Sequence, residues 1–121
     1  MKLDLHTQAA EADIKRGICE LLDKYPTRIM FTVTPPKRTK YSSKFMRAGW
    51  PDIYGVMRKT HLPERNGATG YFYLETFFIE VKKPGGALSV EQHRILERAK
   101  EWGAITCVAT CLEDVRKALG L

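Results

Sequence analysis

Apolar residues near the start of the chain recur at intervals of three or four positions, at Ile14, Ile18, Leu21, Leu22 and Tyr25. This spacing places them on one face of a helix, so we expect a helix over residues 7–25. Pro26 follows directly, and proline ends a helix because it has no backbone N–H to donate. The chain is therefore expected to begin with an amphipathic helix.

Three later segments are rich in β-branched and aromatic residues, which favour strands. They cover residues 29–34, 52–57 and 71–82. Asn66-Gly67 lies between the last two segments, and this dipeptide is typical of a tight hairpin, so we expect these two strands to pair antiparallel. A fourth apolar segment, residues 104–109, is expected to be a short buried strand.

Two more helices are predicted from their capping signals. Ser89 and Gln92 have the spacing of a capping box, which predicts a helix that begins after Ser89. Thr110 and Glu113 have the same spacing, which predicts a cap at Thr110 and a final helix near the end of the chain.

The resulting order is helix, three strands, helix, strand, helix, which is typical of an α/β protein. Because a strand that follows a helical crossover usually lies parallel to its neighbour, we expect a mixed four-stranded sheet flanked by helices. The 121 residues, of which 44% are hydrophobic, suit a single domain over residues 1–121.

Several classes of protein are disfavoured by the sequence. The chain has no apolar run of the roughly 18 residues that a transmembrane helix needs. Its first residues lack the apolar stretch of a signal peptide. The three cysteines have no partner pair at zinc spacing and are expected to be small buried or half-buried thiols. We therefore expect an intracellular, cytoplasmic protein.

The positive charge of the chain is unevenly distributed. The formal net charge is +6, and no acidic residue occurs between Asp23 and Asp52. The cations late in this stretch, with Tyr41 and Phe45 among them, are Lys37, Arg38, Lys40, Lys44 and Arg47. Cations with interspersed aromatic residues suit the phosphates and bases of a nucleic acid, so we expect these five cations to contact DNA. A solvated basic loop is the alternative.

The candidate chemistry lies at the end of the third predicted strand. Side chains alternate along a strand, so Glu80 and Lys82 face the same side. Alone, this pattern also fits a strand end that emerges into solvent. Asp52 changes the interpretation, because pairing through the hairpin would bring it close to Glu80. Two such carboxylates repel each other unless a cation lies between them, and oxygen ligands suit Mg²⁺ or Mn²⁺. Lys82 is then placed to orient a water or to stabilise a transition state.

Three motifs carry a resemblance to a known family, namely Gly49-Trp50-Pro51-Asp52-Ile53, Phe78-Ile79-Glu80-Val81-Lys82 and Leu88-Ser89-x-x-Gln92. In this order they resemble the VRR-NUC family of the PD-(D/E)xK nuclease superfamily, and the resemblance extends over nearly the whole chain. It implies a restriction-endonuclease-like core and a Mg²⁺- or Mn²⁺-dependent DNA endonuclease. It also implies that Asp52, Glu80 and the carbonyl oxygen of Val81 bind the metal and that Lys82 is the catalytic lysine.

The same resemblance implies roles for two residues on helices. Gln92 matches the family's glutamine on the helix after the third strand, although the capping box alone also explains it. Glu11 is the best match to a glutamate on the first helix, where an acid can bind the metal or its water. Glu11 lies on the apolar stripe of that helix, and an acid that complements the helix dipole is the alternative.

The resemblance makes branched DNA, such as a Holliday junction, a plausible substrate, and a stand-alone domain of this size suggests a phage protein. We expect a homodimer, because two active sites could then face two strands. A non-catalytic nucleic-acid-binding module that kept the nuclease fold is the main alternative, and a structural protein with incidental charge is a third. Trp50 leaves two interpretations open, stacking on a base or a core or hinge position.

Overall fold

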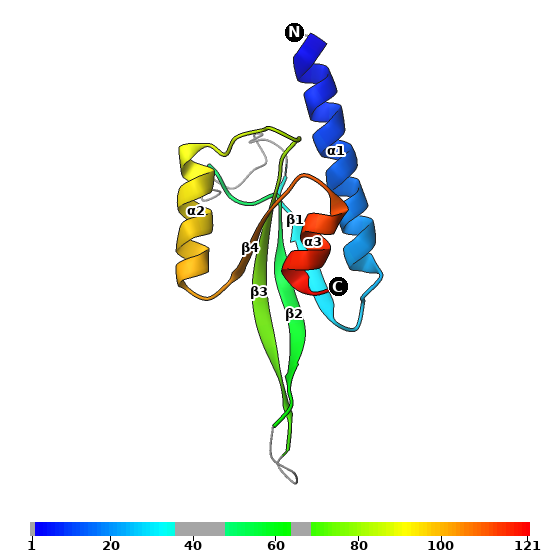
Figure 1. Cartoon of the computed structure of the whole chain (residues 1–121), viewed down its shortest axis with the longest axis vertical. Helices are drawn as coiled ribbons and strands as arrows, with labels where there is room; N and C mark the ends of the chain where they lie inside the picture. The colour runs from blue at the N-terminus through cyan, green and yellow to red at the C-terminus, as the bar shows by residue number, and fades with distance from the viewer. Residues whose placement is uncertain (1, 36–47, 64–68) are drawn as a thin grey trace.

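The computed structural model describes residues 2–35, 48–63 and 69–121, with side chains from residue 10 onward. This part of the chain forms an α/β structure with three helices and one four-stranded mixed sheet (Figure 1). The elements, in chain order, are α1 (Lys2–Asp23), β1 (Ile29–Val33), β2 (Ile53–His61), β3 (Tyr71–Val81), α2 (Val90–Glu101), β4 (Ile105–Ala109) and α3 (Leu112–Leu119). The expected order of elements is confirmed.

The strands lie in the order β1-β2-β3-β4. β1 pairs antiparallel with β2, and β2 pairs antiparallel with β3. β4 follows the α2 crossover and pairs parallel with β3. The predicted antiparallel and parallel pairings are therefore both confirmed.

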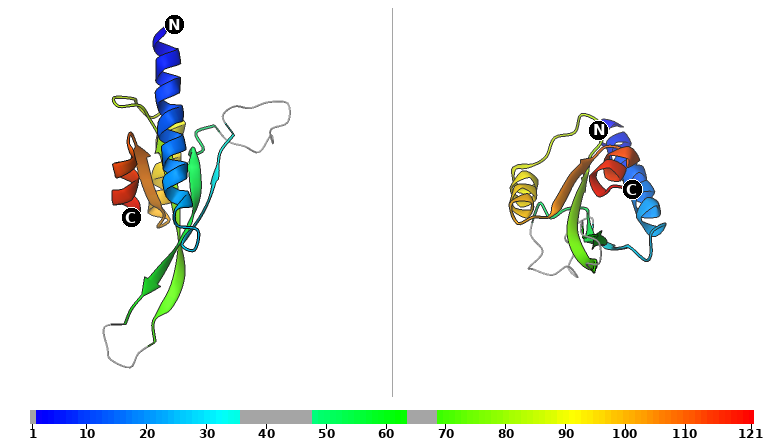
Figure 2. Two further views of the ribbon diagram at one scale, coloured as in Figure 1. Left: turned by 90° about the vertical axis from the view of Figure 1, so that its right-hand side faces the viewer. Right: turned by 60° about the horizontal axis from the view of Figure 1, so that its bottom comes forward.

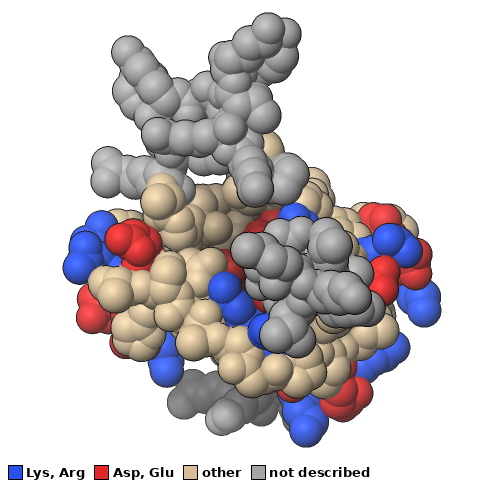
Figure 3. Space-filling view, turned by 90° about the horizontal axis from the view of Figure 1, so that it is seen from above, with Lys and Arg blue, Asp and Glu red and all other residues tan. Residues whose placement is uncertain are grey.

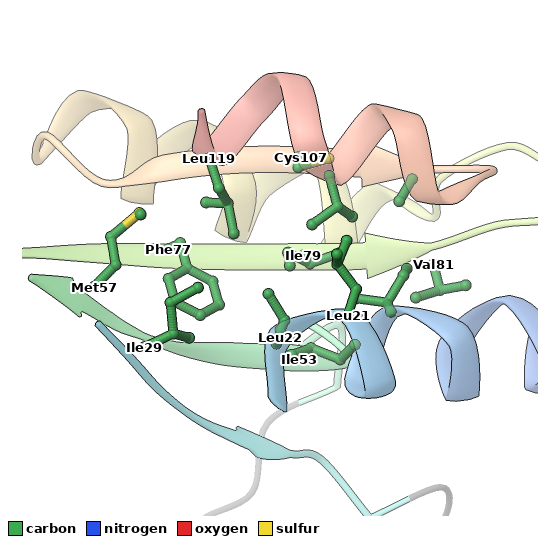
Figure 4. Close-up of a cluster of buried hydrophobic side chains, with 13 residues drawn as sticks. Leu21, Leu22, Ile29, Ile53, Met57, Phe77, Ile79, Val81, Cys107 and Leu119 are labelled. Carbon is green, nitrogen blue, oxygen red and sulfur yellow. The ribbon is translucent and has the colours of Figure 1, made fainter. Parts of the chain in front are cut away.

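The helices cover both faces of the sheet. α1 and α3 lie on one face and α2 lies on the other (Figure 2). The main hydrophobic core fills the space beneath α1 and α3, where Leu22, Phe77 and Leu119 are fully buried (Figure 4). Each such side chain contributes about 1.5–3 kcal/mol relative to its exposed state. This core fixes the position of β3, which carries Glu80.

β2 and β3 are longer than the core requires. β2 continues to His61, beyond the expected end at residue 57, and it pairs with β3 as far as Tyr71. This outer part of the hairpin extends past the helices (Figure 1). The sequence pattern missed the last residues of β2 because they are polar. Their backbone still pairs with β3, although they cover no hydrophobic core. Asn66-Gly67 lies outside the described residues.

One predicted cap is wrong. α3 begins at Leu112 with Cys111 as its N-cap residue, and that side chain makes no capping hydrogen bond. Instead Asp114 Oδ2 accepts hydrogen bonds from the N–H and the hydroxyl of Thr110, at 2.9 and 3.2 Å. The N–H of Thr110 is the main cause that lowers the pKa of Asp114. An ionised carboxylate that accepts both Thr110 donors makes stronger bonds than a hydroxyl cap, so Thr110 stays outside the helix.

β1 and β2 approach each other closely at Gly55. A Cβ atom at this position would lie 2.1 Å from the carbonyl oxygen of Met30. Only glycine therefore fits here without a backbone shift. Within the described ranges, no helix has the length and apolar character needed to cross a membrane.

Candidate functional site

Asp52 and Glu80 meet at one end of the sheet. Ile53 pairs with Ile79, so Asp52, the residue directly before β2, lies in line with Glu80 on β3. Asp52 Oδ2 accepts a hydrogen bond of 2.8 Å from the backbone N–H of Val81. Figure 3 looks onto this end of the molecule and shows recessed acidic atoms with Lys or Arg atoms beside them. The structure thus brings the two predicted carboxylates together.

The segment that carries Asp52 is held from β1. The N–H of Thr34 donates to the carbonyl oxygen of Asp52 at 2.8 Å, and the Thr34 hydroxyl donates to that of Pro51 at 2.5 Å. Pro51 itself is fully buried. These contacts fix the backbone on both sides of the Pro51–Asp52 bond, so Thr34 is a positioning residue that sequence reasoning missed.

At Gly49, the same segment packs closely against the start of α2. The φ of Gly49, +84°, is a left-handed conformation that favours glycine, and an added Cβ would lie 2.7 Å from the backbone carbonyl carbon of Glu91. The sequence contains the glycine but gives no sign of this contact, because Gly49 and Glu91 are far apart in the chain. The close approach links the position of Asp52 to that of α2.

Glu80 is the only buried charged side chain of the described core, with 3% of its surface exposed. Its Oε1 atom accepts a hydrogen bond of 3.0 Å from Nε2 of Gln92. Its Oε2 atom is buried and accepts no hydrogen bond from any residue that the structure describes. A buried carboxylate oxygen without a donor is unfavourable, so this atom requires either a proton or a cation.

The pKa of Glu80 is raised from 4.5 to about 8. Burial is the largest cause, followed by a hydrogen bond with the Asp52 carboxyl and by repulsion from its charge. A carboxyl group with a pKa near 8 keeps its proton at pH 7. Without a metal ion, the pair therefore holds a proton at neutral pH, and a divalent cation would take that proton's place.

Gln92 forms the predicted capping box and also contacts the acid pair. Its Oε1 atom accepts from the N–H of Ser89 at 2.8 Å, and its own N–H donates to the Ser89 hydroxyl at 3.1 Å, which completes the predicted capping box of α2. Its Nε2 atom is then directed to Glu80. One amide group thus fixes the start of α2 and orients the buried carboxylate.

Lys82 lies two residues after Glu80, on the same side of β3 by strand alternation. Its side chain is half-buried, and its positive charge lowers the pKa of Glu80, although burial and Asp52 outweigh this effect. The backbone N–H of Lys82 donates to the carbonyl oxygen of Ala109 at 2.9 Å. The ammonium group therefore acts on the acid pair from a firmly held part of the chain.

Glu11 reaches the same end of the sheet from α1. Its Oε1 atom accepts a hydrogen bond of 3.2 Å from the backbone N–H of Lys83. Its negative charge also raises the pKa of Glu80, as the smallest of the causes. The structure thus places Glu11 near the acid pair, with one carboxylate oxygen bound to the backbone of β3's end.

The donor set at this end fits a hard divalent cation. In the described part of the chain, no group of three or more His, Cys, Asp or Glu side chains is arranged to hold a metal ion. The acid pair offers two carboxylates, with the carbonyl oxygen of Val81 in the same strand. Mg²⁺ commonly uses one or two carboxylates and keeps water or phosphate oxygens in its other positions. The Glu80 oxygen that lacks a donor is consistent with such an ion.

The expected DNA-contacting cations lie outside the described residues: Lys37, Arg38, Lys40, Lys44 and Arg47. No family model matches the chain, and comparisons with curated proteins and with solved structures found no match. The chemistry of this site is therefore argued from its own geometry.

Proposed function

We propose that this protein is a metal-dependent nuclease that hydrolyses phosphodiester bonds in DNA, with Asp52, Glu80 and Lys82 at the centre of its active site. The observation that carries the proposal is the buried Oε2 atom of Glu80, which has no described hydrogen-bond partner and belongs to a carboxyl group beside Asp52. The order of elements and the motif spacing also support a restriction-endonuclease-like core of the VRR-NUC type.

Asp52, Glu80 and the carbonyl oxygen of Val81 would hold Mg²⁺ or Mn²⁺. When bound, the ion would supply charge neutralisation at the phosphate and a more acidic water. Glu11 would support the ion or its water from α1. Hydrolysis adds one water across a P–O bond, which leaves a phosphate monoester on one product and a hydroxyl on the other.

The protein's own side chains perform the remaining tasks. Gln92 keeps the Glu80 carboxylate oriented, and the N–H of Val81 does the same for Asp52. The Lys82 ammonium stabilises negative charge on the phosphoryl oxygens as the bond to water forms. These groups are held in place before substrate binds, so little reorganisation is needed during the reaction.

The test is an assay with labelled linear, nicked and four-way DNA in the presence of Mg²⁺, Mn²⁺ or EDTA. We expect cutting with either ion and none in EDTA. Glu80→Gln should abolish cutting, and Lys82→Ala should slow it about 10²- to 10³-fold. Glu97→Gln, on the exposed face of α2, is the matched control and should cut normally. Intact DNA under every ion, or normal cutting by Glu80→Gln, would overturn the proposal.

The preferred substrate and the assembly belong to the same proposal. Faster cutting of the four-way substrate would support a role on branched DNA, as the resemblance to VRR-NUC nucleases implies. Light scattering on the purified protein would test the homodimer, in which a symmetric pair of sites faces two strands.

A further inference from the structure

An apolar cavity of about 270 Å³ lies between α2 and the sheet. It is lined by Trp50, Phe78, Ile95, Arg98, Ala99 and Trp102. A second cavity of about 450 Å³ shares Phe78, Ala99 and Trp102 with it and continues along β3 past Leu74 and Thr76. The two cavities thus adjoin at Trp102.

The smaller cavity is a neighbour of the acid pair. Phe78 precedes Glu80 by two residues on the same side of β3, a distance of about 7 Å along the strand. Trp50 precedes Asp52 by two residues, and Ile95 follows Gln92 by three on the same side of α2. Three of its walls are therefore built from the elements that position the candidate active site.

The aromatic wall of the cavity is fixed by packing. The Trp50 ring meets the rings of Tyr54 and Phe78 edge-on, with centroids 5.6 Å apart in both pairs. Such contacts hold an aromatic ring in one orientation. The wall can therefore receive a flat ligand without first being ordered.

Trp102 is the most exposed of the apolar residues that line the smaller cavity. It is the C-cap residue of α2, and 80% of its surface is exposed. An indole ring exposed to this extent is unfavourable in water, and it gains most when a flat apolar ring covers it. Arg98, one turn earlier on α2, adds a positive charge to the same cavity.

We propose that this cavity receives one unpaired nucleobase of the substrate, next to the bond that the acid pair cuts. An aromatic wall stacks on a base of any sequence, and Arg98 complements the attached phosphate. A base inside a duplex has both of its faces covered, so only a base released from its stack can enter. The inference rests on the proposed function for the position of the cut, but not for binding.

Base binding can be measured without cleavage through the intrinsic fluorescence of the protein. Both tryptophans of the chain, Trp50 and Trp102, line this cavity, so a stacked base should quench most of the tryptophan signal. In EDTA, we expect a short single-stranded oligonucleotide to quench this emission strongly and a blunt duplex of the same length to quench it weakly. Equal quenching by the two probes would overturn the proposal.

Substitutions separate stacking from general attraction to DNA. Trp102→Ala should weaken binding of the single strand about tenfold and leave duplex binding unchanged, whereas Trp102→Phe should keep most of the affinity. Phe72→Ala is the matched control, because Phe72 is also an exposed aromatic residue, at 65%, but lies on the outer hairpin. An equal loss for both DNA forms, or no loss, contradicts the assignment.

A second copy of the chain is the competing occupant of this apolar surface. If Trp102→Ala converts a dimer into a monomer in light scattering, the cavity is a protein interface and the assignment fails. The proposed function and this inference can fail separately. Selective binding through Trp102 without cutting under any ion would refute only the nuclease, and metal-dependent cutting that ignores Trp102 would refute only the base site.

Discussion

At the scale of single residues, the Glu80 carboxyl links the chemistry of the site to the stability of the fold. Its pKa is raised from 4.5 to about 8, because it is buried beside the Asp52 carboxyl. Between these pH values the unfolded chain has lost the proton and the folded protein keeps it. Unfolding therefore releases a proton in this window, and the free energy of unfolding falls as the pH rises through it.

The first prediction concerns Glu80→Gln in the absence of metal. The amide does not titrate, so the variant should lack this pH dependence. We expect it to match the natural protein near pH 4.5 and to be more stable by on the order of 3 kcal/mol near pH 8. Urea unfolding in EDTA at several pH values measures the difference. Parallel stability curves for the two proteins would show that Glu80 does not titrate as described.

The second prediction separates the two roles of Gln92 by comparison with Ser89. Ser89→Ala removes half of the capping box and leaves the bond from Gln92 to Glu80 possible, so it should cost about 1 kcal/mol of stability and little activity. Gln92→Ala removes the other half of the capping box and also the only described side-chain donor to Glu80, so it should lower both stability and activity. Thermal unfolding and the cleavage rate are the two readouts. Equal activity of the two variants would limit Gln92 to capping.

At the scale of elements, glycines set how closely the sheet, the Asp52 segment and α2 approach one another. Gly49→Ala is the third prediction, with Gly85→Ala as its control. Both positions have φ near +80°, at +84° and +81°, but a Cβ at Gly85 has open space while one at Gly49 meets the backbone of Glu91. Both variants should lose about 1 kcal/mol through backbone strain.

Only Gly49→Ala should also displace the Asp52 segment from α2 and slow cleavage. Thermal unfolding measures the shared loss, and the cleavage rate measures the specific one. Equal cleavage rates in the two alanine variants would mean that the contact between Gly49 and α2 does not position Asp52.

The outer part of the hairpin forms a separate unit of the β2–β3 pair. The core residues nearest to it are Met57 and Phe77, and beyond them the strands extend past the helices (Figure 1). The fourth prediction is that replacement of residues 60–72 by an Asn-Gly turn between Lys59 and Tyr73 changes the unfolding free energy by less than about 1 kcal/mol. Urea unfolding tests this, and a large loss would show that the outer hairpin supports the core.

At the scale of the whole molecule, local patterns predicted the order of elements, and local contacts explain why. The capping box joins Ser89 and Gln92, which are three residues apart, and strand alternation joins Glu80 with Lys82. Seven of the eight strand boundaries lie within one residue of the predicted positions, and only the end of β2 differs by more. The long hairpin was underestimated because its outer pairs bury no core.

Sequence patterns could not predict contacts between residues that are far apart in the chain. Thr34 binds the segment before β2, Gly49 touches α2, and Glu11 binds the N–H of Lys83. Glu11 was identified through family resemblance, and Gly49 belongs to a motif that carries this resemblance, but its contact with α2 was not foreseen; nothing in the sequence singled out Thr34. The cap at Thr110 was wrong for a local reason, because the carboxylate of Asp114, four residues later, accepts hydrogen bonds from its N–H and hydroxyl.

The fifth prediction concerns the thermal stability of the whole domain with divalent ions. An ion that binds only the folded state raises stability in proportion to its occupancy. We expect Mg²⁺ or Mn²⁺ to raise the Tm by several degrees, more near pH 8 than near pH 6, because the ion competes with the proton on Glu80. Asp52→Asn and Glu80→Gln should show no such rise. An equal rise in all three proteins would place the ion elsewhere.

The amide of position 92 limits which amino acids evolution or an engineer can place there. The side chain must accept a hydrogen bond through Oε1 and donate another through Nε2. It must also be long enough for both atoms to reach their partners, the N–H of Ser89 and the Glu80 carboxylate. Asparagine is too short, and an ionised glutamate cannot donate a hydrogen bond and would add a third carboxyl group beside Asp52 and Glu80. Position 89 tolerates threonine or aspartate, since either can cap a helix. Directed libraries at both positions should therefore return one surviving residue at 92 and several at 89.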